Sequence, residues 1–376
     1  MKVQYFILLC FTVIFSACNE SNSKTVDGSD STVSKQADSP EILYSFAFVG
    51  CNRVDRHDTD KKEATDASTA NLSALKRIYT DISNLERQPE LFFFLGDLVL
   101  GESTLENLDS QLEAWVKLYT NKSFSAISDS SIEMVAVPGN HEMLTYADHG
   151  IPNHSEWPLQ GATAIWMKHM QPFLPSDREY ISGLDSLINQ ATFSFVRNHI
   201  GFIVMNTDTY NAPTKENPYG LEGIIPLQWI SDKVKAYQAD ESIEPIFVLG
   251  HKPYYVGGQP QTGHKGLPQG PELWPLLQEH QVLAMLSAHE HDYQRMQPQG
   301  EGTYQIIAGN GGSPYGGATF FGYTIINILS NGEVELQSKG FDIGEPYYQA
   351  VPENKMTVRD STILSWTKNA NSYVNP

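Results

Sequence analysis

The sequence predicts an α/β protein in which two β-sheets pack together and helices flank them. Three observations support this fold class. The chain has 376 residues, 40% of them hydrophobic, which is enough to bury a sizeable core. Apolar β-rich segments alternate with segments of helical spacing, which favours parallel strands joined by right-handed crossovers. Beyond residue 300, strands follow one another across glycine turns, which favours an antiparallel part.

The first half of the folded region predicts strands and helices in alternation. Its apolar, β-rich runs predict buried strands at 42–50, 91–96 and 131–139. Apolar residues at helical spacing predict helices at 68–85 and 105–119. The following segment, 143–190, is rich in Trp, His and Pro, so it predicts loops with a single helix at 162–170.

The second half predicts further alternation and then a run of strands. Residues 191–208 predict two strands that meet at an Arg-Asn-His turn. The next predicted elements are a helix at 225–238, a strand at 243–250, a helix at 272–281 and a strand at 282–289. Three β-rich segments follow between glycine turns, at 302–309, 321–329 and 332–340.

The N-terminal segment has the composition of a bacterial export signal. Lys2 precedes an apolar run, 5–15, that is too short to span a bilayer. Cys18 follows a Ser-Ala pair as in a lipobox, with Phe15 where Leu is usual, and ordinary cleavage nearby is the alternative. Residues 19–40, rich in Ser, Asn and Asp, predict a flexible tether. The expected parts are a signal peptide at 1–18, the tether, a single domain at 41–345 and a C-terminal extension at 346–376.

This signal predicts a location and leaves one cysteine unpaired. A lipidated Cys18 followed by Asn19 resembles an outer-membrane address in the envelope of a Gram-negative-type bacterium; a soluble periplasmic protein is the alternative. Cys10 would be lost with the signal, so Cys51 has no disulfide partner. Cys51 is therefore either a buried core thiol or a metal thiolate.

The charge of the chain limits its partners. A net charge of −19 argues against binding to a nucleic-acid backbone or an anionic membrane surface, because no basic patch would offset the repulsion. Any membrane contact is thus expected through the lipid anchor alone. A small anionic substrate would need local positive charge, most simply from bound metal ions.

Side chains that can bind metal follow five of the predicted strands. They are Cys51, Asp97, Asn140 with His141 and Glu142, His251, and His289 with Glu290 and His291. Sites in open α/β sheets form at the carboxyl ends of strands, and the preceding glycines allow sharp turns there. A lone His or Asp at a strand end is more often structural. Five in succession predict a metal site.

Four of these segments resemble the motifs of a known family. FLGDLVLG, VPGNHE, VLGHKPYY and LSAHEHDYQR are similar to those of calcineurin-like metallophosphoesterases, above all the purple acid phosphatase and alkaline phosphatase D-like branch. The colinear likeness runs from about Ser45 to about Asn331 and includes a glycine-rich loop at 306–317. It implies a four-layer α/β/β/α sandwich of two mixed sheets flanked by helices. It also implies hydrolysis of a small phosphate ester at two metal ions, which could be iron, zinc or manganese.

The resemblance implies a role for each motif residue. Two ions about 4 Å apart can clamp a phosphoryl group and generate a hydroxide nucleophile near neutral pH. Asp97 would bridge them. The second ion would also take Asn140, His251 and His289, and the first would take His291 and a residue of the first strand. His141 would protonate the leaving oxygen or stabilise the transferring phosphoryl group. Glu142 and Glu290 are expected to support ligands rather than to bind metal.

The first strand departs from the family pattern. Many relatives have Asp-x-His where this chain has Cys51-Asn52-Arg53, so Cys51 stands at the ligand position. Arg53 has no lone pair to donate, so it is predicted either to bind substrate phosphate or to be a surface residue. Asn52 is expected to cap the turn, with metal binding through its amide oxygen as the alternative. Leu100 replaces a tyrosine ligand, so either the first ion is not iron or Cys51 supplies the anionic ligand alone.

Two classes of function remain open. The first is a phosphoesterase, with phosphomonoesters favoured over diesters. The second is a non-catalytic, surface-tethered binding protein on the same scaffold, which the altered first strand motivates. Intact motif residues favour the enzyme. His264, in a glycine-rich loop, is a further candidate for substrate binding, the alternative being a mobile surface histidine.

Overall fold

The fold is known from a computed structural model of the chain. It describes residues 40–54, 70–101, 104–143, 158–181, 190–209, 224–313, 317–344, 355–366 and 373–376. The predicted signal peptide, Cys18 and nearly all of the tether lie outside these ranges. One compact unit comprises Pro40–Pro376. In the part of the chain described, no helix is both long and apolar enough to cross a membrane.

The first sheet has six strands in the order β15-β14-β13-β1-β2-β3. Its bounds are β1 Ile42–Val49, β2 Leu91–Leu95, β3 Glu133–Val137, β13 Phe320–Leu329, β14 Val334–Asp342 and β15 Thr357–Leu364. β1, β2 and β3 are parallel, whereas β13 is antiparallel to β1, β14 to β13 and β15 to β14. The all-apolar β2 is buried along its whole length, as expected of a parallel strand covered on both faces.

The second sheet has eight strands in the order β16-β11-β12-β10-β7-β6-β5-β4. Its bounds are β4 Glu179–Tyr180, β5 Phe193–Arg197, β6 Ile200–Met205, β7 Ile246–Gly250, β10 Ala284–Ser287, β11 Tyr293–Met296, β12 Tyr304–Ala308 and β16 Tyr373–Val374. β6, β7, β10 and β12 are parallel, and the outer strands are antiparallel. A short hairpin, β8 Tyr255–Val256 and β9 Gln259–Pro260, belongs to neither sheet.

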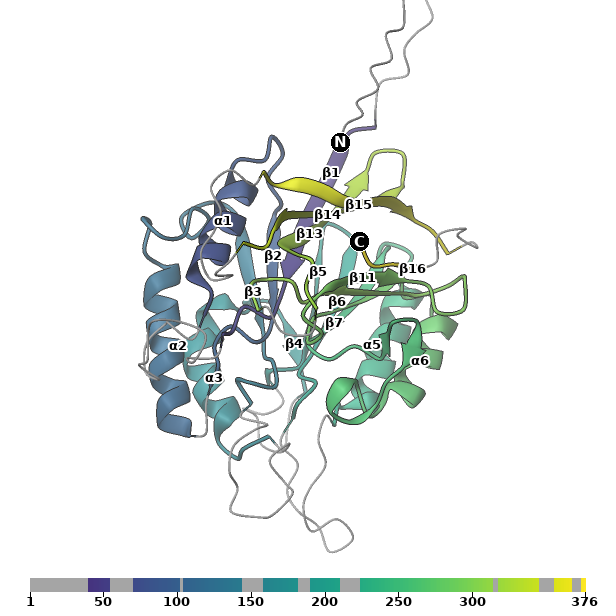
Figure 1. Ribbon diagram of the computed structural model, residues 1–376. Helices are drawn as coiled ribbons and strands as arrows, with labels where there is room; N and C mark the ends of the chain where they lie inside the picture. Colours follow the sequence, from purple (N-terminus) through teal and green to yellow (C-terminus); the bar gives the residue numbers. More distant parts are fainter. Residues whose placement is uncertain are drawn as a thin grey trace, which may run out of the picture. The chain divides into compact units, whose positions relative to one another are not determined.

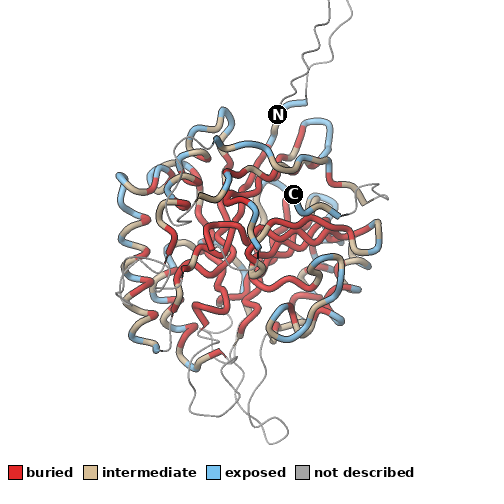
Figure 2. Tube along the Cα trace, viewed as in Figure 1, coloured by how far each residue is buried: buried red, intermediate tan, exposed pale blue. Residues whose placement is uncertain are grey.

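The two sheets pack face to face around an aromatic core. Phe46 of β1 contacts Phe202 of β6 and Phe247 of β7, with ring centroids 5.1 and 5.0 Å apart. Phe93 of β2 contacts the same Phe202 at 5.2 Å. Such ring pairs add roughly 0.5–1.5 kcal/mol each to the burial of their area. Figure 2 shows the buried residues concentrated along the strands.

Helices cover the outer face of each sheet (Figure 1). The first sheet is covered by α1 Leu72–Ser83 and α2 Leu105–Tyr119, and α3 Ala162–Met170 packs beside α2. Tyr79 of α1 contacts Phe92, and Trp115 of α2 contacts Phe94, so both helices lie on β2. α5 Leu227–Ala239 and α6 Gly270–Glu279 share a second hydrophobic cluster with β6, β7 and β10.

The predicted fold class is confirmed, because helix, sheet, sheet and helix layers follow one another. The two strands of 191–208 meet at Asn198 and His199, which both have positive φ. The helix predicted at 272–281 begins earlier, at Gly270, with a proline in its first turn as helix starts allow. β15 and β16 lie within the predicted C-terminal extension, and each is the edge strand of one sheet.

Candidate metal centre

The candidate ligands lie where strands of both sheets end. Three of them, Cys51, Asp97 and His289, have positive φ angles of 57°, 57° and 67°. Non-glycine residues adopt this conformation rarely and at a cost, and such residues cluster at functional sites. The surrounding packing must therefore fix these three side chains in place.

Two glycines let the β2 and β3 turns meet. A Cβ on Gly139 would lie 2.3 Å from Asp97 Oδ1, and one on Gly96 would lie 2.5 Å from the Gly139 amide nitrogen. Both contacts are far closer than real Cβ atoms make. Gly96 also has a φ of 85°, which any side chain would strain. The glycines before Asp97 and Asn140 thus allow the two turns to touch.

Two histidines direct ring nitrogens at the Asn140 side chain. His251 Nδ1 donates to the Leu95 carbonyl at 2.7 Å, and His289 Nε2 donates to the His264 carbonyl at 2.7 Å. A carbonyl only accepts, so these partners assign the proton in each neutral ring. The opposite nitrogens, His251 Nε2 and His289 Nδ1, then carry lone pairs. They lie 2.9 and 3.1 Å from Asn140 Oδ1.

This arrangement fits a cation. His251 Nε2 and His289 Nδ1 are 3.3 Å apart, and Asp97 Oδ1 lies 3.3 Å from His251 Nε2. Four acceptor atoms this close repel one another unless positive charge lies among them. Burial lowers the pKa of His251, but Asp97, Asp208 and the hydrogen bond to Leu95 together raise it by more, so the pKa lies above its ordinary value. The cluster therefore attracts positive charge, and its nitrogen and oxygen donors suit a transition metal.

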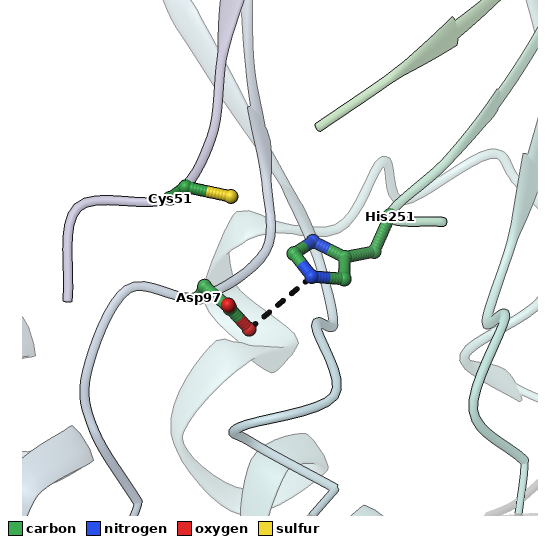
Figure 3. Close-up of side chains that lie close together, drawn as sticks. All are labelled: Cys51, Asp97 and His251. Atoms are coloured by element: carbon green, nitrogen blue, oxygen red, sulfur yellow. Dashed lines mark ion pairs between the residues drawn. The ribbon is translucent and has the colours of Figure 1, made fainter. Parts of the chain in front are cut away.

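Cys51 lies on another side of the same cluster. Figure 3 shows Cys51, Asp97 and His251 facing one another from three loops, and their ligand atoms lie within 4.8 Å of one another. Cys51 is completely buried, and its Sγ accepts a hydrogen bond from the His289 amide at 3.1 Å. Burial, followed by the charge of Asp97, raises the pKa of the thiol well above its ordinary value. Arg53 and the His289 amide oppose this rise without reversing it, so a bound cation would be needed to favour the thiolate.

His291 and Arg53 flank the cluster. His291 Nδ1 lies 3.1 Å from Ser313 Oγ, and the Ser313 amide donates to the Cys51 carbonyl at 3.0 Å. The glycine-rich loop thus joins His291 to the end of β1. Arg53 Nε lies 3.7 Å from Asp97 Oδ2, so a fixed positive charge faces the carboxylate. His291 is buried, and Arg53 is partly exposed.

Glu142 holds the β2 and β3 turns together. Its Oε2 accepts from the amides of Asp97 and Gly139, each at 2.8 Å, and its Oε1 accepts from Val99 at 3.1 Å. Burial, followed by the charge of Asp97, raises its pKa to about 7. The carboxylate binds backbone rather than pointing a free oxygen at the cluster, which agrees with the predicted supporting role.

Two further histidines border the cluster. The His141 amide donates to Asp97 Oδ1 at 3.1 Å, and its Nδ1 lies 2.8 Å from the Leu100 carbonyl. Burial, followed by the charge of Arg53, lowers its pKa to about 3. The His264 ring lies edge-on to that of His289, with centroids 5.1 Å apart. Both residues therefore lie beside candidate ligands, His141 next to Asp97 and His264 next to His289.

The structure thus brings all nine predicted site residues into one region. Asn52, predicted to cap the turn, donates through Nδ2 to the carbonyls of Asn71 and Gly311 at 3.1 and 2.7 Å. The sequence reasoning missed a buried ion pair, Asp208 with Lys252, next to His251. The rule that polar residues follow strands could have found Asp208, because it comes three residues after β6.

Comparisons with known proteins identify a family and similar folds. Residues 55–293 match the family model described as calcineurin-like phosphoesterase. The structure of PhoD is similar with a TM-score of 0.56 and 12% identity over 90% of this chain and 72% of that one. GAP50, the anchor in the inner membrane complex of Plasmodium, is similar with a TM-score of 0.48 and 15% identity, over 88% of this chain and 91% of that one. A 5'-nucleotidase from Candida albicans is similar with a TM-score of 0.38 and 10% identity, over 82% of this chain and 53% of that one. At such identities the likeness concerns the fold alone. The search of curated proteins gave no match.

Proposed function

The chain belongs to the calcineurin-like phosphoesterase family, and on that premise we propose that it is a phosphomonoesterase with a centre of two metal ions. Membership makes it a metal-dependent hydrolase of phosphoric ester bonds. The observation that carries the finer proposal is the cluster of acceptor atoms from Asp97, Asn140, His251 and His289. The chain and PhoD are alike in fold. That likeness supports the proposal that the chain is a phosphatase of the same branch.

The proposed ligands divide between two ions. Asp97 would bridge them, Asn140, His251 and His289 would complete one site, and Cys51 and His291 would complete the other. When bound, such ions lower the pKa of coordinated water and neutralise phosphoryl oxygens. Zinc, iron or manganese would suit these donors, and a thiolate at Cys51 would favour zinc or iron in its site.

Three residues of the chain are proposed to act on the substrate. The Arg53 guanidinium, already beside Asp97, would bind phosphate oxygens through its planar fork. His141 would donate to the leaving oxygen, because a phosphate dianion beside the ring raises the pKa of an imidazole. His264, on the loop that His289 contacts, would meet the ester group.

The test is hydrolysis of activated esters by the purified chain reconstituted with zinc, iron or manganese. We expect cleavage of p-nitrophenyl phosphate between pH 5 and 10, faster than cleavage of the matching diester. His141→Ala should lower kcat by about 10²–10⁴-fold. No cleavage at any pH would favour the non-catalytic binding protein, whereas cleavage that His141→Ala leaves unchanged would refute the proposed role of His141.

We also propose that Cys18 anchors the chain by lipid in the envelope of a Gram-negative-type bacterium, with a soluble periplasmic protein as the alternative. The Ser-Ala pair before Cys18 and the polar segment after it support this proposal. Labelling with a fatty-acid analogue in such a bacterium tests it. Cys18→Ala should abolish the label, whereas Cys10→Ala should leave it. Label that persists in Cys18→Ala contradicts the anchor.

A further inference from the structure

A buried ion pair lies beside the metal centre without taking part in the proposed ligand set. Lys252 directly follows His251 at the end of β7, and Asp208 follows the end of β6. Lys252 Nζ lies 2.9 Å from Asp208 Oδ1, and both side chains are completely buried. β6 and β7 are parallel neighbours, paired as far as Met205 and Gly250. The pair therefore joins two adjacent strand ends at the centre.

Stability alone does not account for this pair. Removing both charges from water carries a desolvation penalty that their mutual attraction often fails to offset. Apolar residues of similar volume in their place often give the fold the same stability or more. A buried ion pair is therefore weak evidence of a stabilising role. Its place next to a candidate ligand indicates another task.

Short-range contacts make the two strand ends one rigid unit. The Lys252 amide donates to Thr207 Oγ1 at 3.1 Å, and that hydroxyl donates to Asp208 Oδ2 at 3.1 Å. The Asp208 amide donates to Asn206 Oδ1 at 3.0 Å. A Cβ on Gly250 would lie 2.8 Å from Thr207 Cγ2, so the two backbones approach closely. His251 lies inside this unit, between Gly250 and Lys252.

We propose that Asp208 and Lys252 are positioning residues for His251. Their ion pair fixes the backbone of residue 251, so that the ring can direct Nδ1 at the Leu95 carbonyl and Nε2 at Asn140. Asp208 also neutralises the Lys252 ammonium, which would otherwise repel a cation at the ligands. This inference rests on the proposed metal site but not on the proposed catalysis.

The test compares metal affinity with stability in a double-mutant cycle. The variants are Asp208→Asn, Lys252→Met and the double substitution, with Zn²⁺ binding measured by competition against a chelator. Unfolding of the metal-free protein is followed by urea. Each single variant should lose stability, because it removes the opposite charge that faces a buried one. The double variant should regain stability yet bind Zn²⁺ about 10–100-fold more weakly than the wild type, as when residues that support ligands are lost.

A matched control is the exposed pair of Glu113 and Lys117 on α2. Substituting both as Gln and Met should change neither stability nor Zn²⁺ affinity. A double variant at 208 and 252 that binds Zn²⁺ as tightly as the wild type overturns the inference and leaves the metal site intact. A wild-type chain that binds no metal overturns both the inference and the proposed centre.

Discussion

At the scale of single residues, Cys51 bears on what would occupy the proposed ion site nearest β1. Its thiol is completely buried within a large hydrophobic cluster, as a packing residue would be. Yet its Sγ faces a carboxylate and a ring nitrogen, and its φ is positive, which packing alone does not require. A polar neighbourhood and a strained backbone are typical of ligands. The geometry therefore favours the metal thiolate over the core thiol.

Substitution of Cys51 separates these two roles. If the thiolate binds metal, both Cys51→Ser and Cys51→Ala should lose about one metal equivalent per chain, because neither side chain supplies an anionic sulfur. Elemental analysis of the purified variants measures this. Two full equivalents in Cys51→Ala, with only lower resistance to urea, would restore the core-thiol role. The serine variant should then be less stable than the wild type by about 1–3 kcal/mol, because it buries a hydroxyl.

Glu142 allows a second test at this scale. Its two oxygens accept three amide protons from the β2 and β3 turns, and glutamine has only one oxygen to accept them. Glu142→Gln should therefore leave at least one buried amide facing an NH₂ group and loosen Asp97. We expect Zn²⁺ affinity to fall about 10–100-fold in a chelator competition. Glu113→Gln is the matched control, since Glu113 is exposed on α2, where it pairs with Lys117. Equal losses in both variants would count against the positioning role of Glu142.

At the scale of elements, α2 and α3 are joined by ionic contacts on their outer side. Asp109 of α2 lies 2.7 Å from Lys168 Nζ and 2.5 Å from His169 Nε2 of α3. Lys168 first, and then His169, lower the pKa of Asp109. A carboxyl whose folded pKa is lowered adds stability above its unfolded pKa and loses that contribution as the pH falls through the folded pKa. The α2–α3 contact should therefore weaken in acid.

Asp109→Asn tests this contact. The variant should be less stable than the wild type at pH 7 by roughly 0.2–1 kcal/mol, the usual range for solvent-screened pairs. The difference should shrink below about pH 4, the ordinary pKa of an aspartate, and vanish once the carboxyl is protonated in both states. Urea unfolding at several pH values measures it. Asp232→Asn on α5 is the control, because Asp232 forms no ion pair with the described residues. A difference for Asp109→Asn that is constant with pH would refute the ionic explanation.

The helices and strands also show how much of the structure could be predicted from the sequence. Periodicity predicted β2, α2 and α3 nearly to the residue, because each has one strong apolar pattern and a clear boundary. It missed β15, whose residues are mostly exposed or half-buried at a sheet edge, and the two-residue strand β16. The polar residues that follow the predicted strands indicated which side chains are candidate ligands and in what order they come along the chain. They could not predict that His251 and Asn140, 111 residues apart, would meet, because that contact requires the packing of two sheets. The carbonyl partners that set the histidine tautomers, and the Asp208–Lys252 pair, likewise exist only in three dimensions.

At the scale of the whole molecule, the C-terminal strands join the two sheets by a second means besides the aromatic core. Arg295 of β11, in the second sheet, forms two contacts with Asp360 of β15, in the first sheet, at 2.7 and 3.1 Å. The Tyr293 hydroxyl adds a hydrogen bond to Asp360 at 2.6 Å. The side chains of Arg295 and Asp360 are only 2% and 8% exposed. The edge strand β15 of the first sheet thus meets β11, the strand next to the edge of the second sheet, at a carboxylate that accepts three hydrogen bonds.

Removing that carboxylate should destabilise the whole fold. Asp360→Ala removes the carboxylate that pairs with the buried Arg295 guanidinium, and breaking a buried ion pair typically costs about 3–5 kcal/mol. The urea midpoint of the metal-free chain measures it. Asp342→Ala is the matched control, because Asp342 pairs with Arg359 within the first sheet and at an exposed position, where the expected loss is under about 1 kcal/mol. If the aromatic core alone held the sheets together, the two variants would lose similar stability. A larger loss for Asp360→Ala would mean that the C-terminal strands fasten the two sheets whose strand ends form the metal centre.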